Sequence, residues 1–237
     1  NKRAFACTRA AWFLKQIREM GEEISIYIFR SAGAWTLNAN YNVGEYNIYH
    51  LPDLTQFDGI ILDVNSIHQR ENYGCGSVAW EYIVNAARQS GKPVLSLANR
   101  IDGFYYVGID NYKAMRLMIE HVFQVHGCRD YWFVMGPKDN YENGQRTQAV
   151  SDYLKEHDII CEDDRFYFGS FEIRSGYRGF LKLYDLHGKP PEAVICANDE
   201  IAGGVCKAAE EKGFSVPGEF IVTGFDNFDK ASCFSPR

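Results

Sequence analysis

Short apolar runs alternate with amphipathic stretches along the whole chain. A run of roughly four to eight apolar residues is typical of a buried strand, whereas apolar residues spaced three and four apart are typical of a helix that buries one face. Residues 11–22 show the helical pattern, because polar and charged side chains separate the apolar Trp12 and Ile17. Residues 57–64, centred on the apolar run that begins at Ile60, predict a strand.

These patterns form two successive runs. The first run predicts a strand at 3–8, a helix at 11–22, a strand at 24–29, a loop at 31–50, a strand at 57–64, a helix at 77–90 and a strand at 92–97. The second run predicts strands at 105–109, 130–135, 165–168, 193–197 and 220–225, with helices at 112–125, 143–156, 175–186 and 200–212 between them. Such alternation predicts an α/β protein with two Rossmann-like lobes, each built on a parallel sheet. A short join near residues 99–106 separates the lobes, which we place at 1–104 and 105–237.

Polar and aromatic residues follow several of the predicted strands. Ligands of open parallel sheets bind at the carboxyl ends of the strands, and two such lobes facing each other would form a cleft that closes around a ligand. The candidate ligand-binding residues are Thr8, Trp35, Asn65, Phe171, Asn198, Asp199 and Asp226, together with Arg146 near the start of its helix. Carboxylates, amides, an arginine and aromatic faces suit a small neutral polyol.

Each candidate also has an ordinary structural explanation. Asn198 or Asp199 could simply cap the helix that follows, as Asp110-Asn111 does for an earlier helix. An arginine in a helix is often solvated, and an aromatic residue such as Phe171 or Trp35 often packs in a core or between lobes. Asp226 and Asn227 form an ordinary turn pair.

Composition and charge exclude several classes of protein. The 237 residues are 46% hydrophobic and 24% charged, which is ordinary for a globular protein and excludes disorder, collagen and coiled coil. The net charge of −6 argues against non-specific nucleic-acid binding, which needs a basic surface. No apolar run is long enough to span a bilayer, and no leader peptide is visible. Because the chain opens with Asn1 rather than Met and stops at Ser-Pro-Arg237, we expect a fragment of a longer protein.

Metal, cofactor and catalytic motifs are not found. The seven cysteines have no CxxC spacing and suggest reduced cytosolic thiols packed as small apolar groups. His121 and His126 lie five residues apart, which in an α-helix does not place two metal ligands on one face. No HExxH, GxSxG, phosphate-loop or dinucleotide fingerprint occurs. The sequence therefore predicts a binding protein with no cofactor and no metal, rather than an enzyme.

Two sequence blocks carry a family resemblance. The first is Pro191-Glu-Ala-Val-Ile-Cys-Ala-Asn-Asp-Glu, and the second runs from Gly213-Phe-Ser-Val-Pro to Gly224-Phe-Asp-Asn. Together they resemble the effector-binding domain of the LacI/GalR transcription regulators. The segments Val107-Gly-Ile-Asp-Asn and Met135-Gly-Pro fall where that family has its counterparts, so the resemblance is dense over 105–237 and only architectural over 1–104.

The resemblance implies a periplasmic-binding-protein-like fold of type I with its ligand between the lobes. Arg146 would then bind effector hydroxyls, Asp199 would accept from a sugar, Phe171 would stack on it, and Asp226 would lie near the hinge-side edge. It also implies a cytoplasmic homodimer whose partner is a small effector, expected to be a carbohydrate. DNA would be bound only through a helix-turn-helix that precedes this chain, and no membrane would be involved.

The sequence also departs from the family pattern. The family continues past Ser-Pro with a strand that crosses back to the first lobe, so the second lobe is expected to be truncated here. The segment 44–62 looks like a subgroup in which similar sensor domains precede signalling modules such as diguanylate cyclases. An extracytoplasmic sugar-binding protein of a transporter, and an enzyme on the same fold, are further alternatives.

Overall fold

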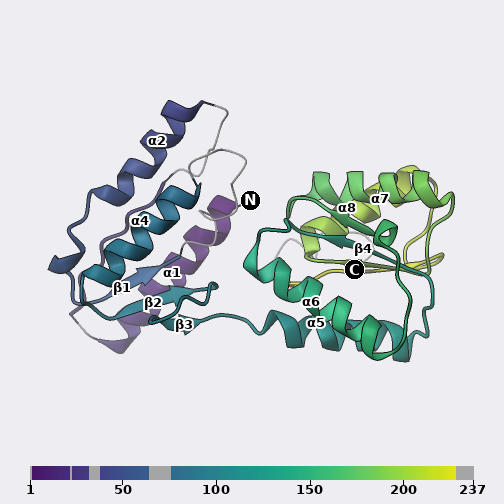
Figure 1. The fold of residues 1–237 in the computed structure, drawn as a ribbon, viewed down its shortest axis with the longest axis horizontal. Helices are drawn as coiled ribbons and strands as arrows, with labels where there is room; N and C mark the ends of the chain where they lie inside the picture. The colour runs from purple at the N-terminus through teal and green to yellow at the C-terminus, as the bar shows by residue number, and fades with distance from the viewer. Residues whose placement is uncertain (1, 22, 32–37, 64–75, 228–237) are drawn as a thin grey trace. The chain divides into compact units, whose positions relative to one another are not determined.

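The computed structural model describes residues 2–21, 23–31, 38–63 and 76–227, and it divides into two compact units, Asn1–Val107 and Gly108–Arg237 (Figure 1). We call them the first unit and the second unit. Both are α/β, and each contains one parallel sheet. The predicted fold class is thereby confirmed.

The first unit contains a three-stranded sheet of order β1-β2-β3. Its strands are β1 (Ile60–Leu62), β2 (Val94–Leu97) and β3 (Tyr105–Val107), and its helices are α1 (Lys2–Met20), α2 (Ala39–Asn47) and α4 (Gly76–Gln89), with 3₁₀ turns at Ile48–His50 and Leu54–Gln56. Apolar residues of α4, including Ile83 and Ala87, form a small core with Ile60 and Val94 of the sheet. We expected β3 to open the second run, but it pairs in parallel with β2 and so belongs to the first sheet.

Three predictions for the first hundred residues are wrong. Residues 3–8 lie inside helix α1 and are not a strand, because this short stretch contains the good helix former alanine and continues without a break into the amphipathic pattern that follows. Residues 24–29 are not in a strand either, and their apolar side chains, such as Tyr27 and Ile28, are largely exposed. The predicted loop over 31–50 contains α2, whose first turn is capped by the Asn38 side chain.

The second unit contains a four-stranded parallel sheet of order β5-β4-β6-β7. Its strands are β4 (Tyr131–Met135), β5 (Phe166–Phe168), β6 (Ala193–Cys196) and β7 (Ile221–Thr223), and its helices are α5 (Asn111–Glu120), α6 (Tyr141–Glu156), α7 (Ile173–His187) and α8 (Asp199–Glu211). Figure 1 shows α5 and α6 on one side of β4 and α7 and α8 on the other. Apart from the predicted helix 112–125, whose α-helical part α5 ends at Glu120, these elements agree with the corresponding predictions to within one or two residues at each end.

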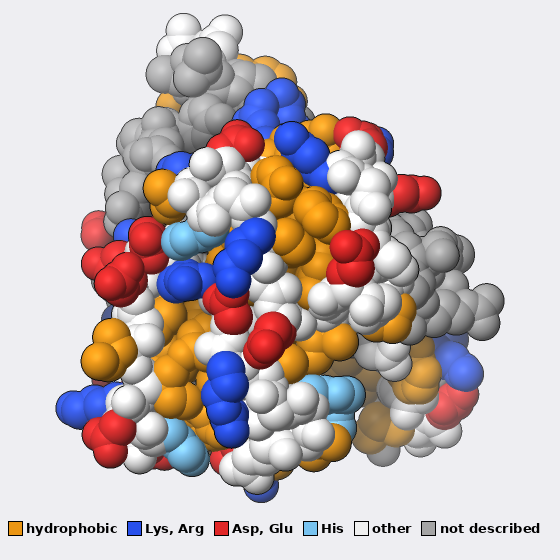
Figure 2. All heavy atoms as spheres, turned by 90° about the vertical axis from the view of Figure 1, so that its right-hand side faces the viewer, with side chains coloured by type: hydrophobic (Ala, Val, Ile, Leu, Met, Phe, Trp, Pro, Cys, Tyr) orange, Lys and Arg blue, Asp and Glu red, His pale blue; other side chains and the backbone are white. Residues whose placement is uncertain are grey.

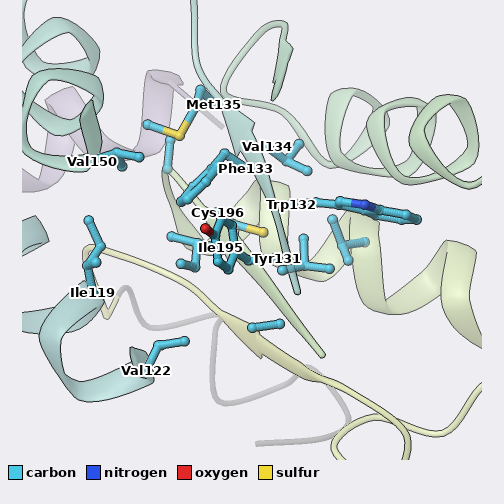
Figure 3. Packing of buried hydrophobic residues seen from close by; sticks show 14 of the residues in the cluster. Ile119, Val122, Tyr131, Trp132, Phe133, Val134, Met135, Val150, Ile195 and Cys196 are labelled. Atoms are coloured by element: carbon cyan, nitrogen blue, oxygen red, sulfur yellow. The ribbon is translucent and has the colours of Figure 1, made fainter. Parts of the chain in front are cut away.

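The core of the second unit lies around β4 and β6. Every residue of these two strands is buried, as expected for parallel strands covered by helices on both faces. Figure 3 shows how the side chains of Trp132 and Phe133 lie on different sides of the sheet. The Trp132 ring contacts Phe180 of α7, with 5.7 Å between ring centroids.

One turn of the helix that begins with α5 is unusual. After Glu120 the chain continues as a π-helical turn over His121–Val125, closed by the His126 amide, which donates to the His121 carbonyl at 3.3 Å. Val122 and Phe123 of this turn are buried in the core. A π-helical turn contains one residue more than an α-helical turn, and a regular apolar pattern does not reveal it.

Candidate functional site: a buried arginine at the carboxyl ends of the strands

The start of α6 is fixed to the end of β4 by two asparagines. Asn140 is the N-cap, and its side chain accepts a hydrogen bond from the Asn143 amide at 2.8 Å. Asn143 in turn accepts from the Gly136 amide at 2.7 Å and donates to the Gly136 and Pro137 carbonyls at 3.2 and 3.0 Å. The first turn of α6 is therefore held against the loop that leaves β4, and Arg146 lies one turn further along.

Arg146 is 3% exposed and donates to three different partners. Its Nε donates to Oδ1 of Asn111 at 2.9 Å, and one terminal nitrogen donates to the carbonyl of Ala197 at 2.6 Å. The other terminal nitrogen donates to Oδ1 of Asp226 at 3.1 Å. The guanidinium carbon also lies 3.9 Å from the centre of the Phe225 ring, a favourable cation–π distance. We call these five residues the Arg146 cluster.

The cluster lies at the carboxyl end of the parallel sheet. Ala197 follows β6 directly, and Phe225 and Asp226 follow β7. Asn111 is the first residue of α5, beside the N-cap Asp110, which accepts from the Lys113 amide at 2.9 Å. Four segments that are far apart in sequence thus meet at the place where open α/β sheets bind ligands.

Asp226 has an unusual backbone conformation. Its φ is +93° and that of Asn227 is +48°, in the region that side chains other than glycine rarely adopt. The Asp226 side chain is 39% exposed, so one part of the carboxylate meets Arg146 while another reaches solvent. Burial raises the pKa of this carboxyl, and the charge and hydrogen bond of Arg146 oppose that change. A strained residue at the end of a strand, next to a buried charge, is a common feature of ligand sites.

The N-terminus of α8 lies beside the cluster. Asn198 is the N-cap, since its side chain accepts from the Ile201 amide at 2.9 Å, and its Nδ2 donates to the carbonyl of Phe171 at 3.4 Å. The amide of the buried Asp199 donates to the carbonyl of Phe225 at 3.0 Å. The capping explanation for Asn198 is therefore confirmed, while contact of either residue with a ligand stays a prediction.

The predicted site residues fall into three groups according to where the structure places them. Arg146, Asn198, Asp199, Phe171 and Asp226 come together in the second unit through the contacts given above. Thr8 was expected to follow a strand, but it lies within helix α1, because the strand predicted at 3–8 does not form. Trp35 and Asn65 lie outside the described residues.

Sequence reasoning missed three members of the cluster. Asn111 was interpreted only as part of a helix cap, Phe225 was not singled out, and the contribution of Ala197 is a backbone carbonyl. The position of Asn111 immediately after a capping aspartate was a usable signal, because the first turn of a helix after a strand often faces a ligand.

The described thiols and carboxylates form no arrangement that is typical of a catalytic centre. On the face drawn in Figure 2, basic and acidic side chains are interspersed with apolar ones and do not gather by sign. Burial raises the pKa of the Cys161 and Cys206 thiols to about 11, so neither is a thiolate nucleophile near neutral pH. Among the described residues no group of three histidine, cysteine, aspartate or glutamate side chains could hold a metal ion, and no helix is long and apolar enough to cross a membrane.

Comparison with known proteins agrees with this architecture. The family described as a periplasmic binding protein-like domain matches residues 121–237. The HTH-type transcriptional repressor PurR of Proteus mirabilis is 32% identical over 136 residues, which are 57% of this chain and 37% of the relative. The chain therefore spans little more than a third of the length of that relative.

Solved structures give the same result for the fold. A sugar-binding transcriptional regulator of the LacI family from Escherichia coli superposes with a TM-score of 0.65 over 97% of this chain and 73% of its own, at 23% identity. The lac repressor dimer bound to operator and an anti-inducer superposes with a TM-score of 0.66 over 93% of this chain and 69% of its own, at 19% identity. With the family match and the related repressor, residues 121–237 are similar to a periplasmic binding protein-like domain of the kind that occurs in LacI-family regulators.

Proposed function

We propose that the Arg146 cluster is the part of an effector site that recognises hydroxyl groups, and that the effector is a carbohydrate or a related small polyol. The observation that carries this proposal is a nearly fully buried guanidinium at the carboxyl end of a parallel sheet, beside a half-exposed carboxylate and an aromatic ring.

The number of hydrogen-bond donors on the Arg146 guanidinium supports this proposal. A guanidinium has about five N–H donors, and three of them are used by Asn111, Ala197 and Asp226 among the described residues. The remaining donors form part of a planar fork whose orientation is fixed, which suits neighbouring oxygens of a polyol. The exposed part of the Asp226 carboxylate supplies an acceptor for hydroxyl protons. The Phe225 ring beside Arg146 and the Phe171 ring, which lies against Gly136 just after β4, suit the C–H faces of a sugar.

We further propose how binding would be used. A ligand that prefers one arrangement of the two units over another would shift their relative angle, and a homodimer in the cytoplasm would pass that shift to a DNA-binding segment in the whole protein. The HTH-type repressor among the relatives and the operator-bound lac repressor dimer support this part of the proposal. Small-angle scattering with and without ligand measures the shift, and analytical ultracentrifugation measures the dimer.

The decisive experiment for the site is a binding screen with variants. Calorimetry against monosaccharides, disaccharides and nucleosides identifies a ligand, whose affinity is then measured for Arg146→Ala, Asp199→Asn and Arg178→Ala. Loss of a charge-assisted hydrogen bond costs about 1.5–3 kcal/mol, so we expect at least a tenfold weakening for Arg146→Ala. Arg178 lies exposed on α7 and serves as the matched control for loss of a positive charge.

Two outcomes would contradict the proposal. Unchanged affinity in Arg146→Ala that still unfolds cooperatively would remove the cluster from the site. Binding of nucleosides alone, with no response to any polyol, would retain the site but refute the carbohydrate class.

A further inference from the structure

The side chains of His121 and His126 converge on the surface of the second unit, far along the helix from the Arg146 cluster. Their Nε2 atoms are 3.1 Å apart, while their ring centroids are 4.9 Å apart. The two rings therefore approach each other at their Nε2 tips. Both residues are exposed to solvent.

The π-helical turn is the reason that these two residues meet. In an α-helix, five residues correspond to about 140° of rotation beyond a full turn, which would place the two side chains on different faces. The π-helical turn His121–Val125 closes instead with the His126 amide on the His121 carbonyl. Our expectation from the sequence that this spacing separates the two histidines is therefore wrong.

The turn is also held rigidly. Val122 and Phe123, which lie between the histidines, are 1% and 4% exposed and anchor the turn in the core. The Phe123 ring lies 4.7 Å from that of Tyr131 and 5.2 Å from that of Tyr153. A ligand bound to the two histidines would therefore meet a backbone that is already ordered, so that only side-chain freedom is lost on binding.

We propose that His121 and His126 form a two-histidine chelate for a divalent first-row transition-metal ion. Imidazole nitrogens bind such ions at about 2.0–2.1 Å, so two nitrogens on one ion are roughly 2.9 Å apart for a right-angled geometry and roughly 3.4 Å apart for a tetrahedral one. The observed separation of 3.1 Å lies between these limits. The two Nε2 atoms can thus face one ion with little adjustment, and water completes the coordination.

The donor set predicts which ions bind. Neutral imidazoles suit copper, nickel and zinc, whereas calcium and magnesium prefer oxygen ligands. For a site with only two nitrogen ligands, the general affinity order places Cu²⁺ first and Ni²⁺ and Zn²⁺ after it. We therefore expect a site that is selective by ligand chemistry and that exchanges its metal readily.

The test uses the whole chain with any histidine tag removed. Calorimetric titration with CuCl₂, NiCl₂, ZnCl₂ and MgCl₂ should give one equivalent of bound Cu²⁺, weaker Ni²⁺ and Zn²⁺, and no Mg²⁺. His121→Asn and His126→Asn should each weaken Cu²⁺ binding at least tenfold, and the double variant should lose little more than either single variant. His157→Asn is the matched control, because His157 is exposed in the same unit but its ring stacks on that of Tyr153.

Electron paramagnetic resonance of the Cu²⁺ complex provides an independent readout, with hyperfine coupling to two imidazole nitrogens expected. Equal Cu²⁺ affinity in the wild-type chain and in His126→Asn, or a spectrum with a single nitrogen ligand, would overturn the proposal. Circular dichroism checks that each exposed substitution leaves the fold intact.

Discussion

Helices α7 and α8 approach each other so closely that a single methyl group at Gly204 should destabilise the second unit. A Cβ at Gly204 would meet the carbonyl oxygen of Ile173 well inside contact distance, and it would lie 2.7 Å from the amide nitrogen of Tyr177. All of these atoms belong to the α7 backbone, which cannot move aside as a flexible side chain would. Gly176 makes the reciprocal approach to the backbone of Ile201.

The cost of Gly204→Ala has two opposing parts. Separating the helices far enough to remove the overlap is overpacking, which costs about 1–3 kcal/mol and sometimes more, and backbone contacts place this case at the upper end. Alanine is a better helix former than glycine by about 1 kcal/mol, which offsets part of that cost. We therefore expect a net loss of at least about 2 kcal/mol, or a fall in the melting temperature of roughly 6 °C or more for a unit of this size.

Gly144→Ala is the matched control. Gly144 lies in α6, and a Cβ there would meet nothing within 4 Å, so only the gain in helix propensity should remain. We expect this variant to be more stable than the wild-type chain by up to about 1 kcal/mol. The same glycine-to-alanine substitution is thus expected to raise the stability at Gly144 and to lower it at Gly204.

Urea unfolding followed by tryptophan fluorescence measures both variants. Trp132 is the only one of the four tryptophans in the second unit and is fully buried there. Replacing Trp12, Trp35 and Trp80 with phenylalanine makes the signal specific for that unit. If Gly204→Ala were as stable as the wild-type chain, or if Gly144→Ala lost as much stability as Gly204→Ala, the explanation by close helix packing would be refuted.

Three further predictions concern charged side chains of the second unit. Arg146→Lys keeps the charge, but its three donors share one nitrogen and cannot reach the partners that Arg146 serves from three separate nitrogens. Leaving a buried acceptor such as the Asn111 Oδ1 unpaired should cost about 1–3 kcal/mol in urea unfolding, and an unchanged midpoint would contradict this. Burial raises the pKa of Asp226, so the stability that this carboxyl contributes is present at low pH and is lost as the pH rises through its folded pKa. Asp226→Asn should therefore be at least as stable as the wild-type chain at pH 7. The difference in stability between the two chains should shrink on acidification. The pKa of Glu192 is lowered because its carboxylate accepts hydrogen bonds from the Arg129 and Asp130 amides. The stability that Glu192 contributes is therefore present near neutral pH and is lost as the pH falls through its folded pKa. Glu192→Gln should be slightly less stable than the wild-type chain at pH 7, and this difference in stability should disappear in acid.

The second unit was predictable from its sequence because local signals agree with the tertiary structure. Asp110 and Asn198 cap the helices they were expected to precede, and Gly127 and Gly213 follow helices with φ of +68° and +84°. Wholly apolar runs identified the buried strands β4 and β6. Each of these signals has a physical cause that acts within a few residues.

The first unit was predicted less well because its local signals conflict. Residues 3–8, in which a short apolar run lies between Arg3 and Thr8, fit a strand or a helix equally well. The helix that forms there places Thr8 within α1 and not after a strand. The Arg146 cluster shows a different difficulty. Asn111 and Arg146 are 35 residues apart and Ala197 follows 51 residues later, so their contacts depend on the sheet order and not on any local pattern.

The close approach of α7 and α8 also bears on how a ligand would be held. Asn198 begins α8, and the carbonyl of Phe171, two residues before α7, accepts a hydrogen bond from its side chain. The two helices also meet backbone to backbone at Gly176 and Gly204, so we expect α7 and α8 to move together and not to slide past each other. Under the proposed function, a small molecule that binds beside α7 and α8 would not have to order these two helices. The entropic cost of binding would then come from the ligand itself and from the turn at Asp226.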